Sequence, residues 1–346
     1  MGKGKKFMQT PDGAGALTMS DAARVGRNGV EKRGFWKLSQ RSAPYIFLAP
    51  YVILFLIFGL FPLLFSIYLS FQSWNPVEGL GAMQYVGLEN FRTALADPWM
   101  WTSLKNTVLI GLYAGISQHL VAIPMACILV GFSDRIRHGL SSAYFLPYIT
   151  SGIAVSLIFF HMFSPQAGIF NQVLALLVDQ PATSWALGWL KPHLPLRWLE
   201  DVDLIKPSIA FVIFWKYTGF NIVLYTTGLM TIPKDLYEAA RIDGAGAFKR
   251  FWHISLPMIR PFIFFAVTLT LIGQLQLFEE PYVLTRGLGG PSQSGLTITA
   301  YLMRIGWEWY EMGTASALAW LLFLLICTLT GLKFVLFGRK GLRNDF

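Results

Sequence analysis

The chain has 346 residues, of which 54% are hydrophobic and only 14% are charged. Soluble domains carry roughly a quarter charged residues, so this composition excludes an ordinary soluble protein and indicates that lipid is the chain's solvent. The net charge of +9 does not indicate nucleic-acid binding, because the basic residues sit mainly in the N-terminal tail and between apolar runs. The two cysteines lie in apolar runs, which excludes a disulfide framework and a CxxC metal site.

The first 41 residues are rich in glycine and basic side chains and contain no apolar run. A cleavable signal peptide would place a short apolar segment in this stretch, so none is indicated. We expect residues 1–41 to be a basic, largely disordered cytoplasmic tail and residues 341–346 to be a cytoplasmic C-terminus. The basic tail residues either contact anionic headgroups or are simply solvated.

Six apolar segments are long enough to cross a bilayer, which takes about 20 residues in a helix. Backbone groups in lipid must satisfy their own hydrogen bonds, and the alternating pattern of a barrel is absent, so helices are predicted. The sequence therefore predicts an all-α, polytopic membrane domain over residues 42–340. The expected helices are residues 44–72, 106–131, 139–163, 207–231, 261–284 and 314–338.

The distribution of lysine and arginine predicts the orientation of these helices. The tail, the segments 132–138 and 232–260, and the C-terminus together hold 19 basic residues, whereas the other three segments between helices hold 7. Basic residues favour the cytoplasmic side, so both termini and the 232–260 loop are expected inside the cell. Six helices with both ends on one side form a self-consistent topology.

The cytoplasmic loop 232–260 is polar and is predicted to form two short helices. Pro233 suits a first helical turn, and Lys234 to Ile242 contains good helix formers. The stretch Asp243-Gly244-Ala245-Gly246 interrupts this helix, because glycine tolerates turn geometry. A second, amphipathic helix is expected from Phe248 to Ile254.

The motifs Glu238-Ala239-Ala240, Asp243-Gly244 and Ile254-Ser255-Leu256-Pro257 stand in this loop. Together the segment resembles the EAA loop of binding-protein-dependent ABC importer permeases. That resemblance implies the type I ABC importer permease fold and a coupling helix that docks in a groove of the ATP-binding subunit. It implies that Glu238 makes a polar contact, that Ala239 and Ala240 form a close-packed face, and that Gly244 beside Asp243 is the hinge. The alternative is an amphipathic surface helix with no docking role.

The resemblance covers about residues 40–340. Further elements that carry it are Phe61-Pro62-Leu63, Gly87-Leu88-Glu89-Asn90-Phe91, Leu284-Thr285-Arg286-Gly287 with Gly289-Gly290-Pro291, and Gly313-Thr314-Ala315-Ser316-Ala317. They are similar to elements of the sugar-permease branch, in particular the maltose-type and glycerol-phosphate-type first permeases. The resemblance implies import of a carbohydrate, such as a di- or oligosaccharide, across the bacterial inner membrane. The implied partners are a second homologous permease, two ATP-binding cassette ATPase subunits and an extracytoplasmic solute-binding protein.

Polar side chains inside the predicted helices are candidates for a transport path, because they are costly in lipid and usually functional. The candidates are Lys216, Tyr217 and Asn221 in the fourth helix, Thr270 and Gln274 in the fifth, and Glu279 towards its end. By resemblance, the sugar site of a maltose-type permease lies on the helices that flank the loop, although the residue types differ here. Amides, hydroxyls and aromatic faces suit a polyhydroxylated ligand, but the same groups can also join helices by hydrogen bonds.

Lys216 leaves several interpretations open. It can pair with Glu279 or Glu280 as a gate or structural ion pair, or it can contact a ligand phosphate, which keeps a glycerol-phosphate importer as the alternative function. An ion-coupled secondary carrier that uses Lys216 and Glu279 is a less favoured alternative from another class.

Enzymatic motifs are missing from the sequence. There is no GxxxxGK[ST] phosphate loop, no HExxH and no GxSxG, and the five histidines are scattered. We therefore expect a transport subunit that carries no catalytic residues, cofactor or metal, with ATP hydrolysis on a separate polypeptide.

Overall fold

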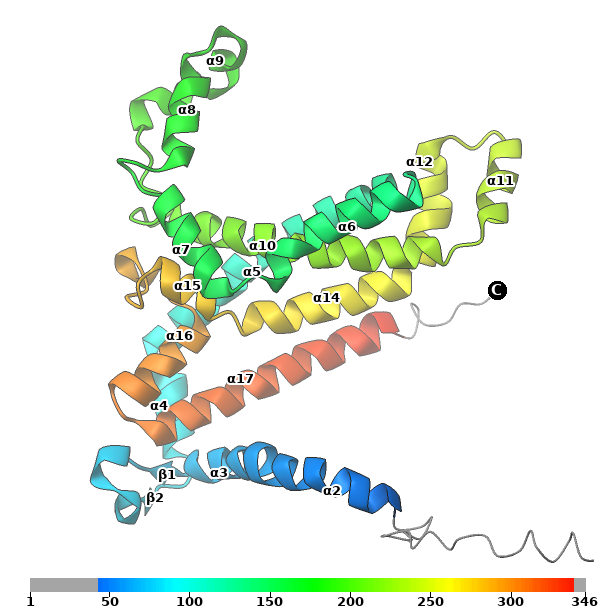
Figure 1. Ribbon diagram of the computed structural model, residues 1–346. Helices are drawn as coiled ribbons and strands as arrows, with labels where there is room; N and C mark the ends of the chain where they lie inside the picture. Colours follow the sequence, from blue (N-terminus) through cyan, green and yellow to red (C-terminus); the bar gives the residue numbers. More distant parts are fainter. Residues whose placement is uncertain (1–42, 339–346) are drawn as a thin grey trace, which may run out of the picture. The chain divides into compact units, whose positions relative to one another are not determined.

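The computed structural model describes residues 43–338, which are mostly helical (Figure 1). The expected tail and C-terminus, residues 1–41 and 341–346, lie outside this range. The chain divides into two units, residues 1–61 and 62–346.

The described part of the first unit is an apolar helix. It consists of α2 (Ala43–Phe55), which continues into a π-helical turn, η1 (Leu56–Leu60). The side chains of this stretch are largely exposed and apolar, for example Tyr45 and Phe58. Such a surface is expected where lipid or a partner, rather than water, surrounds the helix.

The second unit contains the remaining described elements. Its strands, β1 (Gln72–Ser73) and β2 (Gln84–Tyr85), form an antiparallel pair in which Gln72 is opposite Tyr85. Its helices are α3 (Phe61–Leu69), which starts at the boundary, η2 (Pro76–Glu78), η3 (Leu80–Ala82), α4 (Glu89–Ala96), α5 (Pro98–Val130), α6 (Asp134–Ile149), α7 (Gly152–Met162), α8 (Ile169–Asp179), α9 (Pro181–Leu187), η4 (Gly188–His193), α10 (Ile205–Met230), α11 (Lys234–Ile242), α12 (Ala247–Arg250), η5 (Phe251–Ser255), α13 (Leu256–Met258), α14 (Arg260–Leu275), α15 (Glu279–Leu284), η6 (Pro291–Gln293), α16 (Ile298–Met303), η7 (Arg304–Glu308), α17 (Met312–Lys333) and η8 (Phe334–Gly338).

Four helices among the described residues are long and apolar enough to cross a membrane, namely Pro44–Leu69, Pro98–Val130, Ile205–Met230 and Met312–Phe337. The number rises to six if each of two bent helix pairs, α6 with α7 and residues 247–258 with α14, counts as one span. The all-α polytopic architecture expected from the sequence is therefore present.

The expected single helix 139–163 is instead two helices. α6 and α7 meet at an angle of 90°. Pro147 lies in the last turn of α6 and has no N–H to donate, and Thr150 and Ser151 then leave the helical region with ψ angles of 145° and 127°. The break brings Gly152, the first residue of α7, against α15, as described below.

The expected helix 261–284 is also interrupted. α14 ends at Leu275, and the separate helix α15 begins at Glu279. Pro281 cannot donate a hydrogen bond to the Leu277 carbonyl four residues earlier. The hydroxyl of Thr297 donates to that carbonyl instead, at 2.9 Å, and so does the hydroxyl of Thr299. The Leu277 carbonyl at the break thus receives its hydrogen bonds from the segment that contains Thr297 and Thr299.

The expected helix 106–131 begins earlier, at Pro98. Asp97 caps it, because its carboxylate accepts a hydrogen bond of 2.8 Å from the Trp99 backbone N–H, and proline follows at the first helical position. The apolar stretch that signals the helix starts only after Lys105, which explains the difference.

α10 is the central helix of the second unit. It packs against α5, α6, α7, α14 and α15, and Ile205, Ile209 and Ile213 on it are fully buried. At its C-terminal end a further apolar cluster joins Tyr225 and Leu229 to residues of α5 and α14. This packing fixes the helices that carry the candidate site residues.

Candidate functional site

A cavity of about 300 Å³, called here the central cavity, lies chiefly between α10 and α14. It brings together four of the six path residues predicted from the sequence, Tyr217, Asn221, Thr270 and Gln274. Its other lining residues are Gln118, Tyr148, Phe220, Leu269, Ile272, Gly273 and Leu277. No residue of this lining carries a formal charge, so the cavity is walled by amides, hydroxyls, aromatic rings and aliphatic groups.

The amides at the central cavity are only partly satisfied. Asn221 Nδ2 donates to Gln118 Oε1 at 3.3 Å, and Gln118 Nε2 donates to the Ile213 carbonyl at 3.3 Å. The amide oxygens of Asn221 and Gln274 are buried, and neither has a hydrogen-bond partner among the described residues. Since buried polar atoms are normally paired, these two oxygens retain an acceptor capacity that no described residue uses.

Three aromatic rings form one wall of the central cavity. Tyr148 of α6 stacks on Phe220 with ring centroids 4.9 Å apart and contacts Tyr217 edge-on at 5.9 Å. Sequence analysis missed Tyr148, Phe220 and Gln118. Gln118 could have been found by the rule that selected Gln274, because it too is an amide inside an uncharged helix.

Lys216 lies outside the central cavity lining and forms a buried ion pair with Glu280 of α15. Lys216 Nζ and Glu280 Oε1 are 2.7 Å apart, and their side chains are only 6% and 3% exposed. The Tyr217 hydroxyl donates to the same carboxylate oxygen at 3.1 Å. Of the pairings that the sequence left open for Lys216, the structure contains the one with Glu280. The lysine charge is thereby neutralised and held away from the cavity.

Gly152 lies against a charged cluster, which we define as Lys216, Glu279 and Glu280. A Cβ atom at residue 152 would lie 2.6 Å from Lys216 Nζ and 3.2 Å from Glu280 Oε1, and it would also clash with Glu279 Oε2. Glu279, predicted as a path residue, therefore lies at the α6–α7 break and does not line the central cavity. Any side chain at residue 152 would have to displace these charged groups, so the cluster favours glycine here.

The predicted coupling residues lie on α11 and in the turn after it. α11 has the bounds Lys234–Ile242 that the sequence indicates. The turn is closed by hydrogen bonds from Gly244 N–H to the Arg241 carbonyl, at 3.0 Å, and from Ala245 N–H to the Ala240 carbonyl, at 2.8 Å. Gly244 has a φ of +74°, a conformation that favours glycine. Glu238, Ala239, Asp243 and Gly244 are exposed and Ala240 is half-buried, so most of this surface is free.

α11 turns back into α12, η5 and α13, and residues 234–258 together form what we call the α11–α13 hairpin (Figure 1). The expected second helix, residues 248–254, is thus divided between α12 and the π-helical η5. The hydroxyls of Tyr237 and Ser255 are 2.9 Å apart and connect the two arms. Tyr237 and Ile254 also pack on the apolar cluster at the ends of α5 and α10. The hairpin is therefore packed directly against these long helices.

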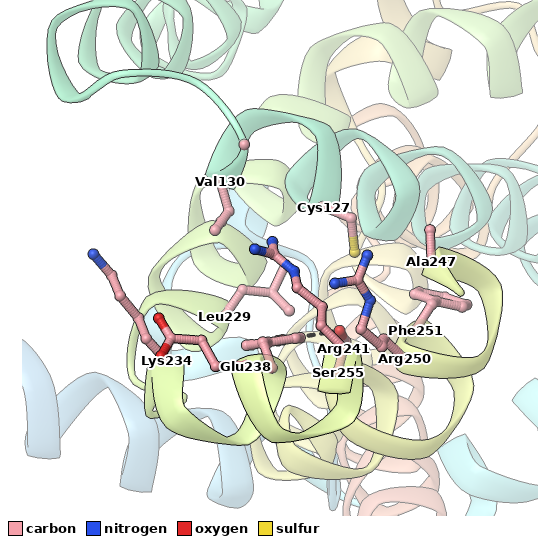
Figure 2. A pocket seen from close by; sticks show the side chains of 12 residues that line it. Cys127, Val130, Leu229, Lys234, Glu238, Arg241, Ala247, Arg250, Phe251 and Ser255 are labelled. Atoms are coloured by element: carbon pink, nitrogen blue, oxygen red, sulfur yellow. Dashed lines mark hydrogen bonds between the residues drawn. The ribbon is translucent and has the colours of Figure 1, made fainter. Parts of the chain in front are cut away.

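A second cavity, of about 490 Å³ and called here the hairpin cavity, lies between the hairpin and the ends of α5 and α10 (Figure 2). Its lining comprises Cys127, Val130, Gly131, Leu229, Lys234, Tyr237, Glu238, Arg241, Ala247, Arg250, Phe251 and Ser255. This cavity contains charged side chains, unlike the central one. Among residues 43–338, no group of three His, Cys, Asp or Glu side chains is placed to hold a metal ion.

These features define a polytopic helical membrane protein with an uncharged interior cavity and a surface hairpin packed against its long helices. Residues 108–340 match the family described as "Binding-protein-dependent transport system inner membrane component". The chain belongs to this family. It is therefore a multi-pass inner-membrane permease component of an ABC transport system, and not an enzyme.

Individual relatives agree with this assignment. The chain is 32% identical over 315 residues to the arabinooligosaccharides transport system permease protein AraP of Bacillus subtilis (strain 168). The alignment covers 89% of this chain and 93% of AraP. It is 31% identical over 297 residues to the lactose transport system permease protein LacF of Rhizobium radiobacter, covering 84% of this chain and 92% of LacF.

The fold also matches a solved transporter. This chain superposes with a TM-score of 0.69, at 23% identity, on a chain from a solved crystal structure. That structure is a bacterial alginate ABC transporter in complex with an alginate pentasaccharide-bound periplasmic protein. The match covers 87% of this chain and 96% of that chain. At this identity the likeness establishes the type I permease fold alone.

Proposed function

We propose that this permease translocates an uncharged carbohydrate, in particular a di- or oligosaccharide, through the central cavity. The observation that carries the proposal is the uncharged lining of that cavity, in which the amides of Gln118, Asn221 and Gln274 occur together with aromatic rings. Sugars offer many hydroxyl donors and apolar ring faces, which amide acceptors and aromatic rings complement. AraP and LacF, both named for transport of oligosaccharides or a disaccharide, support the same substrate class.

The buried ion pair argues against the alternative of a glycerol-phosphate importer. A phosphate ligand needs a cation that is free to bind it, and Lys216 is held by Glu280 at 2.7 Å. Glu279 adds a further carboxylate beside this pair, at Gly152. An ion-coupled carrier would be supported by charged side chains in the central cavity, but the lining that the structure describes contains none.

The proposed mechanism is alternating access. ATP closes a dimer of ATPase subunits, the α11–α13 hairpin moves with its subunit, and the attached ends of α5 and α10 transmit this motion to the cavity. Glu238 supplies the polar contact to the ATPase, Ala239 and Ala240 allow close approach, and Asp243-Gly244 forms the turn. A second homologous permease, two ATPase subunits and an extracytoplasmic solute-binding protein complete the importer. The excess of basic residues in the tail and in the 232–260 loop supports a cytoplasmic location of the hairpin and of both termini.

Charge reversal at Glu238 tests the coupling role. In the purified importer, we expect Glu238→Lys to release the ATPase, or to leave ATP hydrolysis that no longer depends on the loaded binding protein, because a repulsive charge replaces the polar contact. Asp235→Lys is the matched control, since Asp235 is exposed in the first turn of the same helix and does not line the hairpin cavity. Intact ATPase binding and coupled hydrolysis in Glu238→Lys would contradict the assignment.

A further inference from the structure

The hairpin cavity contains two arginines that lack partners. Arg241 lies on α11 and Arg250 on α12, so they come from opposite arms of the hairpin. Both guanidinium groups point into the cavity, towards Cys127 and Val130 at the end of α5 (Figure 2). Neither makes a side-chain hydrogen bond or an ion pair with any of the residues that the structure describes.

The charges around this cavity are unbalanced. Glu238 is its one acidic lining residue, and it makes no ion pair with either arginine among the described residues. Two like charges that share a partly enclosed space repel one another unless an anion lies between them. Planar guanidinium groups in pairs are well suited to bind phosphate oxygens by paired hydrogen bonds.

The surroundings of the arginines are apolar. Val130, Leu229 and Phe251 line the same cavity. Next to it, Phe248 and Trp252 of the hairpin are 75% and 50% exposed. Basic groups combined with exposed aromatic side chains at the end of transmembrane helices are typical of a protein surface at the headgroup level of a bilayer.

We propose that Arg241 and Arg250 form a binding site for a phosphate-bearing anion, and that its occupant is the headgroup of an anionic phospholipid of the cytoplasmic leaflet. Basic pockets between transmembrane helices on the cytoplasmic side have the chemistry that binds such headgroups. The phosphate binds the two guanidinium groups, and the acyl chains lie along the exposed aromatic side chains. The proposal uses the cytoplasmic location of the hairpin given under Proposed function.

A bound headgroup would join the two arms of the hairpin to the end of α5. Tyr237 and Ser255 already connect these arms by a hydrogen bond. An anion held by Arg241 and Arg250 would add a second connection, next to the surface assigned to the ATPase. Anionic lipid is therefore expected to stiffen the element through which the importer is coupled.

Native mass spectrometry of the purified, delipidated importer tests the site. The probe is phosphatidylglycerol, with phosphatidylcholine of the same acyl chains as the neutral comparison. We expect the Arg241→Gln/Arg250→Gln importer to bind phosphatidylglycerol about thirtyfold more weakly than the unmodified importer, from roughly equal contributions of the two arginines. Arg241→Lys/Arg250→Lys should retain part of the binding because it keeps both charges.

The matched control is Arg135→Gln/Lys249→Gln. Both residues are exposed, neither lines the hairpin cavity, and the change in net charge is the same. This control should bind phosphatidylglycerol as the unmodified importer does. Equal losses in the two double variants would show only general attraction to the basic surface and would overturn the site.

Titration with inorganic phosphate, followed by calorimetry, separates the two sources of the anion. Phosphate binding that depends on both arginines, without selectivity for phosphatidylglycerol, would support the anion site but assign it to a soluble ligand. If neither probe binds in an arginine-dependent manner, the site is refuted. These measurements do not involve transport, so they can fail while the proposed importer function stands.

Discussion

The central cavity and the hairpin cavity differ in how charge is arranged around them. Beside the central cavity, the cation of Lys216 is buried and paired with Glu280, and the lining itself is uncharged. At the hairpin cavity, Arg241 and Arg250 are unpaired among the described residues. An unpaired charge is costly within a membrane span but inexpensive where water and headgroups solvate it. A basic residue is therefore structural in the first region, whereas the basic residues of the second are available for binding.

Removing Glu280 should have the largest effect, because it takes away the hydrogen-bonded ion-pair partner of the buried Lys216. We expect Glu280→Leu to destabilise the permease by about 3–5 kcal/mol, measured as a shift in the thermal unfolding of the purified importer. The double variant Lys216→Met/Glu280→Leu should recover most of this loss, because an apolar pair of similar size can replace a buried ion pair. A single variant as stable as the double variant would contradict a buried, obligatory pair.

A methyl group at residue 152 should have a smaller effect. Gly152→Ala places its Cβ against the charged cluster, so Lys216 and Glu280 must separate or the α6–α7 break must shift. Overpacking of this kind costs about 1–3 kcal/mol. Gly139→Ala is the control, because a Cβ at that position meets nothing within 4 Å. Equal thermal stability of the two variants would show that the cluster tolerates displacement.

The smallest effect on stability is expected at the hairpin. Arg241→Gln and Arg250→Gln should each change the free energy of unfolding by no more than about 0.5 kcal/mol, since neither side chain makes a hydrogen bond or ion pair with the described residues. Thermal unfolding in detergent without phospholipid provides the measurement. Losses of stability as large as that expected for Glu280→Leu would contradict the distinction between a paired charge at the central cavity and unpaired charges at the hairpin cavity.

Much of the central cavity lining could be predicted from the sequence, because polar residues in apolar helices stand out. Tyr217, Asn221, Thr270 and Gln274 were selected in this way, and the structure places all four around one cavity. Lys216 was selected by the same rule but proved to be paired. Periodicity alone does not distinguish a cavity-facing lysine from a paired one, because the partner lies 64 residues away on another helix.

Gly152 and the two helix breaks could not be predicted in this way. Residues 139–163 are uniformly free of charge, so hydropathy reports one long segment and gives no sign of a 90° bend. The end of α14 depends on hydroxyls of Thr297 and Thr299, which are distant in sequence. The preference for glycine at residue 152 arises only when this bend brings α7 against α15. Such features depend on tertiary packing and not on local pattern.

Uptake by a Gln274 variant tests most directly whether the central cavity is the carbohydrate path. In proteoliposomes containing the assembled importer, Gln274→Leu should lower ATP-dependent uptake of the saccharide carried by the binding protein at least tenfold, equivalent to about 1.4 kcal/mol. Complex assembly and ATP hydrolysis stimulated by the loaded binding protein should be retained. Uptake at the unmodified rate in Gln274→Leu, and also in Asn221→Leu, would contradict a path through this cavity.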